Sequence, residues 1–199
     1  MKGMKLRKVL CLVLAAVLAF GGILVPSTKA NAAEAPKYRN VMYYGDWSVY
    51  AGQNYFNPSD IDGSQITHLN FAFMDVDKSG NLVLCDEFAD FDKLLPEQTG
   101  LPYGAPYGGV LGGMVILRNK YPNMKIGISV GGWTRSGDFP AMAGNAAARK
   151  NFAQNIAKFV DYLGFDFVDI DWEYPCDVRA SDSEGNGVTI DKGCAGTPE

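Results

Sequence analysis

The stretch from Gly164 to Pro175, which reads Gly-Phe-Asp-Phe-Val-Asp-Ile-Asp-Trp-Glu-Tyr-Pro, constrains the chain more than any other. Its alternation has the period of two of a β-strand, which places Asp169, Asp171 and Glu173 on one face. Because a strand rises about 3.3 Å per residue, successive carboxylates lie roughly 6–7 Å apart. Crowding raises the pKa of at least one of them, so a carboxylic acid can keep a proton to donate near neutral pH. The stretch therefore predicts a strand that carries acid/base chemistry at its C-terminal edge.

Two other interpretations of this stretch are an edge strand with a solvated acidic face and a calcium-binding loop. A calcium loop usually separates its acidic residues with Gly and Asn. Here the intervening residues are Val168, Ile170 and Trp172, which favour strands. The pattern therefore argues against the calcium loop, and a second motif argues against both alternatives.

That second motif closes the preceding predicted strand, residues 124–133. The strand ends in Ser129-Val-Gly131-Gly132, followed by Trp133. Glycines at a strand end permit a tight turn and close packing beside the acidic strand. We expect the two glycines to be structural, and Ser129 to organise the acidic side chains rather than to act as a nucleophile.

The rest of the pattern alternates strands and helices. Residues 66–76 are almost continuously apolar, as expected of a parallel strand covered on both faces. Asn145 can cap a helix that Gly164 ends, and a strand, helix and strand in this order form a right-handed unit. The predicted strands are 41–44, 66–76, 124–133 and 164–175, and the predicted helices are 110–119 and 146–163.

The acidic run Asp166-x-x-Asp169-x-Asp171-x-Glu173, together with Ser-x-Gly-Gly-Trp, resembles the signature of glycoside hydrolase family 18, the family of chitinases and related endo-β-N-acetylglucosaminidases. The resemblance implies a (β/α)₈ TIM barrel, an α/β fold. A complete barrel takes about 250 residues, so residues 33–199 are expected to supply only about the first four β/α units of a truncated catalytic domain. One departure is Phe167, where the family usually has glycine. Its parity matches that of the acids, so it should point into the lower barrel.

The resemblance also implies roles for individual residues. Glu173 would be the general acid and then the base, in a retaining reaction in which the acetamido oxygen of the substrate attacks the anomeric carbon. Asp171 would orient that acetamido group, and Asp169 would share charge or a proton with Asp171. Asp166 would be structural. The candidate sugar-contacting aromatic residues are Trp47, Phe73, Trp133 and Tyr174. No cofactor and no metal is expected.

Residues 1–32 are expected to be a secretory signal peptide. A basic start precedes an apolar run from Val9 to Val25, and Ala30-Asn-Ala32 gives a small-x-small cleavage pattern. Secretion to the extracellular space would follow, with no membrane attachment after cleavage. This segment holds five of the 18 Lys and Arg residues and none of the 22 acids, which leaves a net charge of −9 for the remainder. Such a balance argues against nucleic acid as a partner and is compatible with a neutral polysaccharide.

Three further predictions concern cysteines, the lone histidine and a long connection. Cys176 and Cys194 are the expected disulfide pair, which leaves Cys85 over. His68 lies early on its strand and is expected to be structural. The connection 77–106 is expected to be a solvated insertion.

Three functional alternatives stay open at this stage. The chain is part of a hydrolase of N-acetylglucosamine polymers, a non-catalytic chitin-binding or sugar-binding relative, or an inactive fragment. A non-catalytic relative would typically lack the acid that Glu173 supplies here. The substrate among N-acetylglucosamine glycans, endo or exo action, and the oligomeric state do not follow from the sequence.

Overall fold

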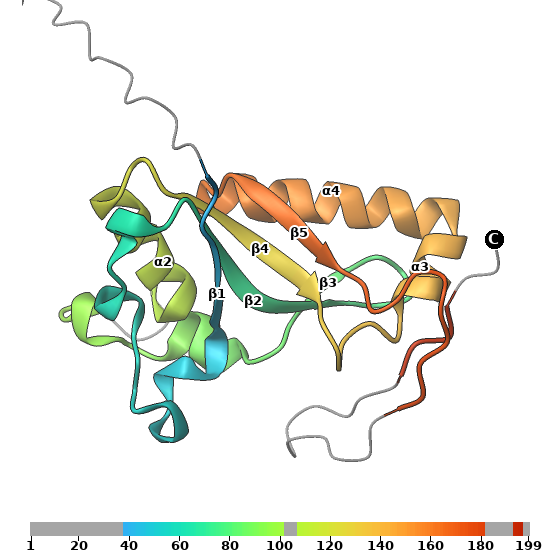
Figure 1. Cartoon of the computed structure of the whole chain (residues 1–199), viewed down its shortest axis with the longest axis horizontal. Coiled ribbons are helices and arrows are strands. Elements are labelled where there is room, and N and C mark those ends of the chain that lie inside the picture. The colour runs from blue at the N-terminus through green and yellow to red at the C-terminus, as the bar shows by residue number, and fades with distance from the viewer. Residues whose placement is uncertain (1–37, 102–106, 182–192, 197–199) are drawn as a thin grey trace, which may run out of the picture. The chain divides into compact units, whose positions relative to one another are not determined.

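A computed structural model of the chain describes residues 38–101, 107–181 and 193–196. The predicted signal peptide lies outside these residues. The described elements are built around one sheet, in which β1, β2, β4 and β5 are parallel neighbours in that order and β3 pairs antiparallel with β2 (Figure 1). The strands are β1 (Val41–Gly45), β2 (His68–Val76), β3 (Leu82–Leu84), β4 (Lys125–Gly131) and β5 (Phe167–Asp171). The α-helices are α2 (Gly109–Lys120), α3 (Phe139–Gly144) and α4 (Ala146–Leu163).

The prediction of α4 is confirmed at both ends. The Asn145 side-chain oxygen accepts hydrogen bonds from the backbone N–H groups of Ala147 (2.9 Å) and Ala148 (3.2 Å), as a helix N-cap does. Gly164 ends the helix with a φ of 66°, a backbone conformation that glycine adopts without steric cost. Helix α2 extends the predicted 110–119 by one residue at each end.

The hydrophobic core lies between the sheet and its helices. Alternate residues of the central strands, such as Phe71 of β2 and Ile128 of β4, are fully buried against helical residues such as Leu111 and Met114. The opposite sheet face carries Ser129 and Asp169, which are paired in register between β4 and β5. The sheet therefore separates an apolar helical layer from a polar face.

On the polar face, the structure places Phe167 above Gly127. A Cβ atom at Gly127 would meet the Phe167 ring at 2.5 Å, so the close approach of this ring requires glycine. The Phe167 ring also meets the His68 ring edge-on, with centroids 5.5 Å apart. His68 Nδ1 lies 2.9 Å from Thr67 Oγ1, in agreement with a structural histidine. The Phe167 ring therefore lies on the sheet face that carries Asp169, as its parity predicts.

The prediction of a solvated connection at 77–106 is wrong for its described part. This segment contains β3, the short helix η5 (Phe88–Asp92) and the 3₁₀ turn η6 (Pro96–Gln98). Asp90, Leu95 and Gln98 are buried, and Gln98 Nε2 donates to the carbonyl of Gly109 at the start of α2 (2.6 Å). Leu95 packs in the core while Gln98 hydrogen-bonds main chain, so the segment is part of the folded body.

The predicted disulfide is also absent, because Cys85, Cys176 and Cys194 are all free thiols. Cys176 is exposed, whereas Cys194 is buried and accepts a hydrogen bond from Trp172 Nε1 at 3.2 Å. Cys194 also forms an isolated antiparallel bridge with Arg179. The Cys194 sulfur is therefore held against the end of β5 and does not pair with the exposed Cys176.

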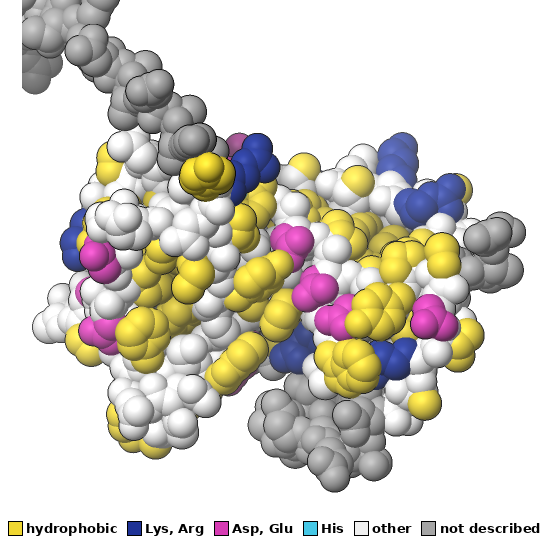
Figure 2. All heavy atoms as spheres, viewed as in Figure 1, with side chains coloured by type: hydrophobic (Ala, Val, Ile, Leu, Met, Phe, Trp, Pro, Cys, Tyr) yellow, Lys and Arg dark blue, Asp and Glu magenta, His cyan; other side chains and the backbone are white. Residues whose placement is uncertain are grey.

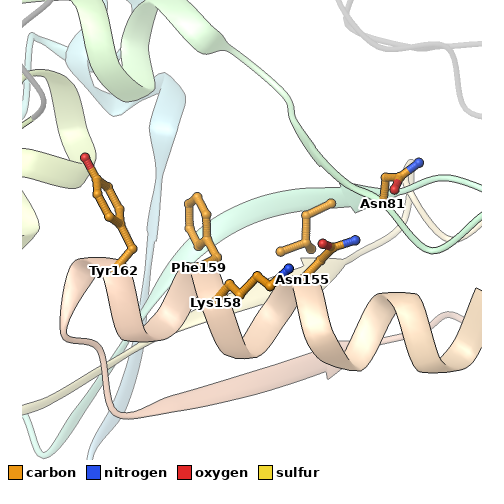
Figure 3. A pocket seen from close by; sticks show the side chains of 6 residues that line it. Asn81, Asn155, Lys158, Phe159 and Tyr162 are labelled. Carbon is orange, nitrogen blue, oxygen red and sulfur yellow. The ribbon is translucent and has the colours of Figure 1, made fainter.

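A hollow of about 460 Å³ lies on the helical side, between α4 and the turn that joins β2 to β3 (Figure 3). Asn155 Nδ2 donates to the carbonyl of Gly80 at 3.1 Å and so ties the turn to the helix. The residues that line the hollow are Asn81, Leu82, Asn155, Lys158, Phe159 and Tyr162. It shares none of these residues with the acidic cluster described next.

Candidate active site

The acidic side chains gather where β5 ends. The sequence pattern predicts Glu173 on the strand, and this is wrong. Strand β5 stops at Asp171, so Glu173 lies two residues beyond its end. Figure 2 shows a row of acidic side chains across the face, running in the direction that β5 takes in Figure 1. The C-terminal edge of a parallel sheet is where barrel enzymes place their chemistry.

Asp169 is held by two hydroxyl groups. Ser129 Oγ on β4 donates to Asp169 Oδ2 at 2.7 Å, and Tyr43 OH on β1 donates to the same oxygen at 2.8 Å. Burial and the hydrogen bond to Asp169 raise the pKa of Tyr43 to about 12, so its hydroxyl stays a donor. The two hydroxyl donors therefore fix the position of this carboxylate between β4 and β1.

Asp171 has a pKa above its ordinary value. Partial burial raises its pKa, and the negative charges of Glu173 and Asp169 raise it further. Asp169 and Asp171 therefore differ in their surroundings, since Asp169 faces two donors and Asp171 faces two other carboxylates. Such a division is how neighbouring carboxylates take different roles.

Asp166 lies at the other end of β5, away from this cluster. It forms salt bridges with Arg118 (3.3 Å) and Lys125 (3.1 Å) and accepts from the backbone N–H of Ile126 (3.0 Å). Partial burial acts to raise the pKa of Asp166, but the hydrogen bonds from Arg118, Ile126 and Lys125 outweigh it and lower the pKa. Asp166 thus joins α2, β4 and the start of β5.

Three of the four predicted aromatic residues line one groove next to the acids. The groove has a volume of about 380 Å³, and Trp47 stacks on Phe73 there with ring centroids 6.3 Å apart. The register between β2 and β4 shifts between Ala72 and Met74, at the position of Phe73. The lining consists of Trp47, Gln53, Phe73, Gly131, Gly132, Trp133, Thr134 and Arg135. Tyr174 is exposed and is not among the residues that line this groove.

The two glycines after Ser129 bring the end of β4 against the end of β5. Gly131 has a φ of 111°, and a Cβ there would lie 2.3 Å from the Asp171 carbonyl oxygen. Gly132 N–H donates to that same carbonyl at 2.7 Å. Glycine is needed at this position because a side chain would separate Asp171 from β4.

The sequence did not single out Tyr43 or Ser136. Tyr43 has the strand parity that points it toward Asp169, but only the pairing of β1 at the sheet edge shows which acid it reaches. Ser136 is fully buried, and its Oγ accepts from the backbone N–H of Glu173 at 2.8 Å. A lone serine in a polar loop gives no sequence signal for such a contact.

Within the described ranges, no group of three or more His, Cys, Asp or Glu residues is arranged to hold a metal ion. Over the same residues, none of the helices is long and apolar enough to cross a membrane.

Comparison with known proteins identifies the family of the chain. The sequence profile of the family described as "Glycosyl hydrolases family 18" matches residues 39–187. The chain belongs to this family. The match spans the acidic run, the Ser-x-Gly-Gly-Trp motif and the groove residues Trp47, Phe73 and Trp133.

Several named family 18 relatives resemble the chain. It is 40% identical to Chitinase 1 of Aphanocladium album over an alignment of 140 residues. This alignment covers 70% of this chain and 33% of the relative. It is 35% identical to Chitinase A1 of Niallia circulans over an alignment of 186 residues, and this alignment covers 77% of this chain and 26% of the relative. The chain thus spans about a third or less of the length of these curated relatives.

Solved structures of chitinases share the fold. The chitinase ChiA74 from Bacillus thuringiensis superimposes with a TM-score of 0.64 at 33% identity, covering 71% of this chain and 28% of that one. The Group IV chitinase of Ostrinia furnacalis in complex with allosamidin gives a TM-score of 0.58 at 31% identity, covering 70% of this chain and 34% of that one. The parallel sheet and its crossover helices therefore match part of a family 18 chitinase.

Proposed function

We propose that the protein to which this chain belongs hydrolyses β-1,4 linkages between N-acetylglucosamine units, in chitin or a related glycan. The observation that carries the proposal is that the neighbouring acids Asp169 and Asp171 lie in different surroundings. Asp169 accepts hydrogen bonds from Ser129 and Tyr43, while Asp171 has a raised pKa beside Glu173. The family membership and the aromatic groove next to these acids support it.

In the proposed reaction, Glu173 protonates the glycosidic oxygen and then activates water as a base. Asp171 orients the acetamido group of the substrate, whose oxygen attacks the anomeric carbon with retention of configuration. Asp169, held by its two hydroxyl donors, shares charge or a proton with Asp171. No metal or organic cofactor enters these steps.

The aromatic groove supplies the binding surface in this proposal. Trp47 and Trp133 are each 45% exposed as residues, so in this proposal they offer ring surface to the apolar faces of sugars. Phe73 lies against Trp47 and forms the floor. A neutral polymer needs no charged receptor, which fits the net negative charge of the chain.

The same proposal includes how much of the barrel is needed for activity. The four parallel strands correspond to the first part of a (β/α)₈ barrel, and we expect the remaining strands to complete the site. Export of the protein, with residues 1–32 as a signal peptide, rests on the sequence of that segment.

A non-catalytic sugar-binding relative is the second candidate, and the exposed groove of Trp47, Phe73 and Trp133 is the observation that favours it. In that case the acids would not be needed for sugar binding. An inactive fragment is the third candidate and concerns only residues 33–199 in isolation.

One experiment separates the three. Residues 33–199 and the longer protein encoded by the natural reading frame are assayed on a fluorogenic N-acetylglucosamine oligomer, each with Glu173→Gln. Glu87→Gln is the matched control, because Glu87 is exposed on the connection after β3. We expect turnover by the longer protein, normal turnover by Glu87→Gln and essentially none by Glu173→Gln. Chitin binding without turnover by the unmodified longer protein would instead support the sugar-binding relative.

A further inference from the structure

The main chain around Glu173 is held by side chains from two other segments. Because β5 ends at Asp171, Glu173 does not belong to the sheet ladder. Its N–H donates to Ser136 Oγ (2.8 Å), and its carbonyl accepts from Arg179 Nε (3.4 Å). Both polar groups of the Glu173 main chain therefore have side-chain partners outside the strand.

Ser136 is suited to this position by its burial and its second hydrogen bond. The hydroxyl accepts from Glu173 and donates its single proton to the carbonyl of Gly132 at 2.9 Å, with the Asp171 carbonyl 3.3 Å away. It is fully buried, so water does not compete for these bonds. Ser136 thus links the turn after β4 to the turn after β5.

Arg179 links the same turn to the aromatic groove. Its guanidinium lies over the Trp133 ring, 4.2 Å from the centroid, and Nη2 donates to the Trp133 carbonyl. This contact covers one face of the indole, and Trp133 as a residue is still 45% exposed. A planar guanidinium can stack and donate in fixed directions at the same time, which an ammonium group cannot do.

The segment that carries Arg179 is itself fixed. The backbone of Arg179 exchanges two hydrogen bonds with Cys194, both of 2.8 Å. The buried Cys194 thiol accepts from Trp172 Nε1 (3.2 Å) and donates to the Tyr174 carbonyl (3.5 Å). These contacts place the Arg179 side chain between Trp133 and Glu173.

We propose that Ser136 and Arg179 are positioning residues for Glu173, and that Arg179 couples the orientation of Trp133 in the sugar groove to the position of the acid. The inference rests on the proposed function of Glu173. The inference adds that a sugar can stack on only one face of Trp133. Sugar binding on that face is linked through Arg179 to the main chain of Glu173. Neither residue touches the reacting atoms.

The test uses the full-length natural protein and separates kcat from KM. Ser136→Ala removes the acceptor for the Glu173 N–H, and we expect kcat to fall about 10–100-fold with KM within about twofold, because a displacement of about 1 Å costs up to about 100-fold. Ser136→Thr keeps the hydroxyl and should recover most of the loss. Arg179→Ala should lower kcat and raise KM together, and Arg179→Lys should not restore them.

The matched control is Arg149→Ala. Arg149 also donates to a main-chain carbonyl, that of Ala143 (2.5 Å), but at the start of α4. It should leave kcat and KM unchanged. Trp emission gives a readout that is independent of activity. Arg179→Ala should shift the emission, and this shift should disappear when Trp133 is replaced by Phe.

The outcomes distinguish this proposal from the proposed function. Unchanged kcat and KM in both Ser136→Ala and Arg179→Ala, with Glu173→Gln inactive, overturn the positioning role and leave the hydrolase assignment standing. Full activity of Glu173→Gln overturns the assignment itself. If Ser136→Ala does not fold, the kcat, KM and Trp emission of Arg179→Ala test the positioning role, because Arg179 is half-exposed.

Discussion

Asp90 gives the sharpest quantitative prediction. It lies on η5 with no exposed surface, and neither carboxylate oxygen has a hydrogen-bond partner within the described structure. Burial and the nearby charges of Asp46 and Asp86 raise its pKa to about 8. The folded protein therefore keeps a proton on Asp90 at neutral pH, whereas the unfolded chain releases it near the ordinary value of 3.8.

The direction in which pH changes the free energy of unfolding follows from proton binding. Between pH 4 and pH 8 the folded state binds more protons than the unfolded state, so the free energy of unfolding falls as pH rises. A difference of one proton changes it by about 1.4 kcal/mol per pH unit. Between pH 5 and pH 7 Asp90 should therefore lower the free energy of unfolding by about 2–3 kcal/mol. Asn has nearly the same shape and no titrating proton, so Asp90→Asn should remove this dependence.

The assay is urea unfolding of the full-length protein at pH 5, 6 and 7, for wild type, Asp90→Asn and Asp161→Asn. Asp161 is exposed on α4 and serves as the control. We expect Asp90→Asn to gain stability over wild type as pH rises, and Asp161→Asn to keep the wild-type slope. The reasoning is refuted if wild type and Asp90→Asn lose stability in parallel across this range.

The remaining predictions concern the packing and the donors of the acidic cluster. Gly131→Ala should cost about 2–4 kcal/mol of unfolding free energy and at least tenfold in kcat, because its φ of 111° and its 2.3 Å approach to the Asp171 carbonyl leave no room for Cβ. Gly52→Ala, with no atom within 4 Å of its Cβ, is the control in thermal unfolding and kinetics; equal losses in both would contradict the argument. Tyr43→Phe and Ser129→Ala should each lower kcat about tenfold and together about a hundredfold or less, since both donate to one oxygen of the same carboxylate. Unchanged pH–rate profiles in both variants would show that these donors do not set the ionisation of the acids.

Local chemistry explains which structural features the sequence could predict. The capped helix from Ala146 to Leu163 was predictable to the residue, because an N-cap asparagine and a terminating glycine act within a few positions of the chain. The parity of Asp169 and Asp171 was predictable for the same reason, since alternation is a property of a single strand. The connection after β2 was not, because its buried Gln98 is stabilised by a partner at the start of α2.

The sequence by itself determined the family, the acidic strand and the Gly131-Gly132 pair, because each is recognised from a motif of a few neighbouring residues. Only the tertiary structure decided that Tyr43 reaches Asp169 across 126 positions of sequence, that Ser136 and Arg179 hold the main chain of Glu173, and that Cys194 stays a thiol against Trp172. These contacts join segments that the sheet order brings together. A hydrogen bond between distant segments leaves no periodic pattern in the chain, so strand pairing had to place its two partners.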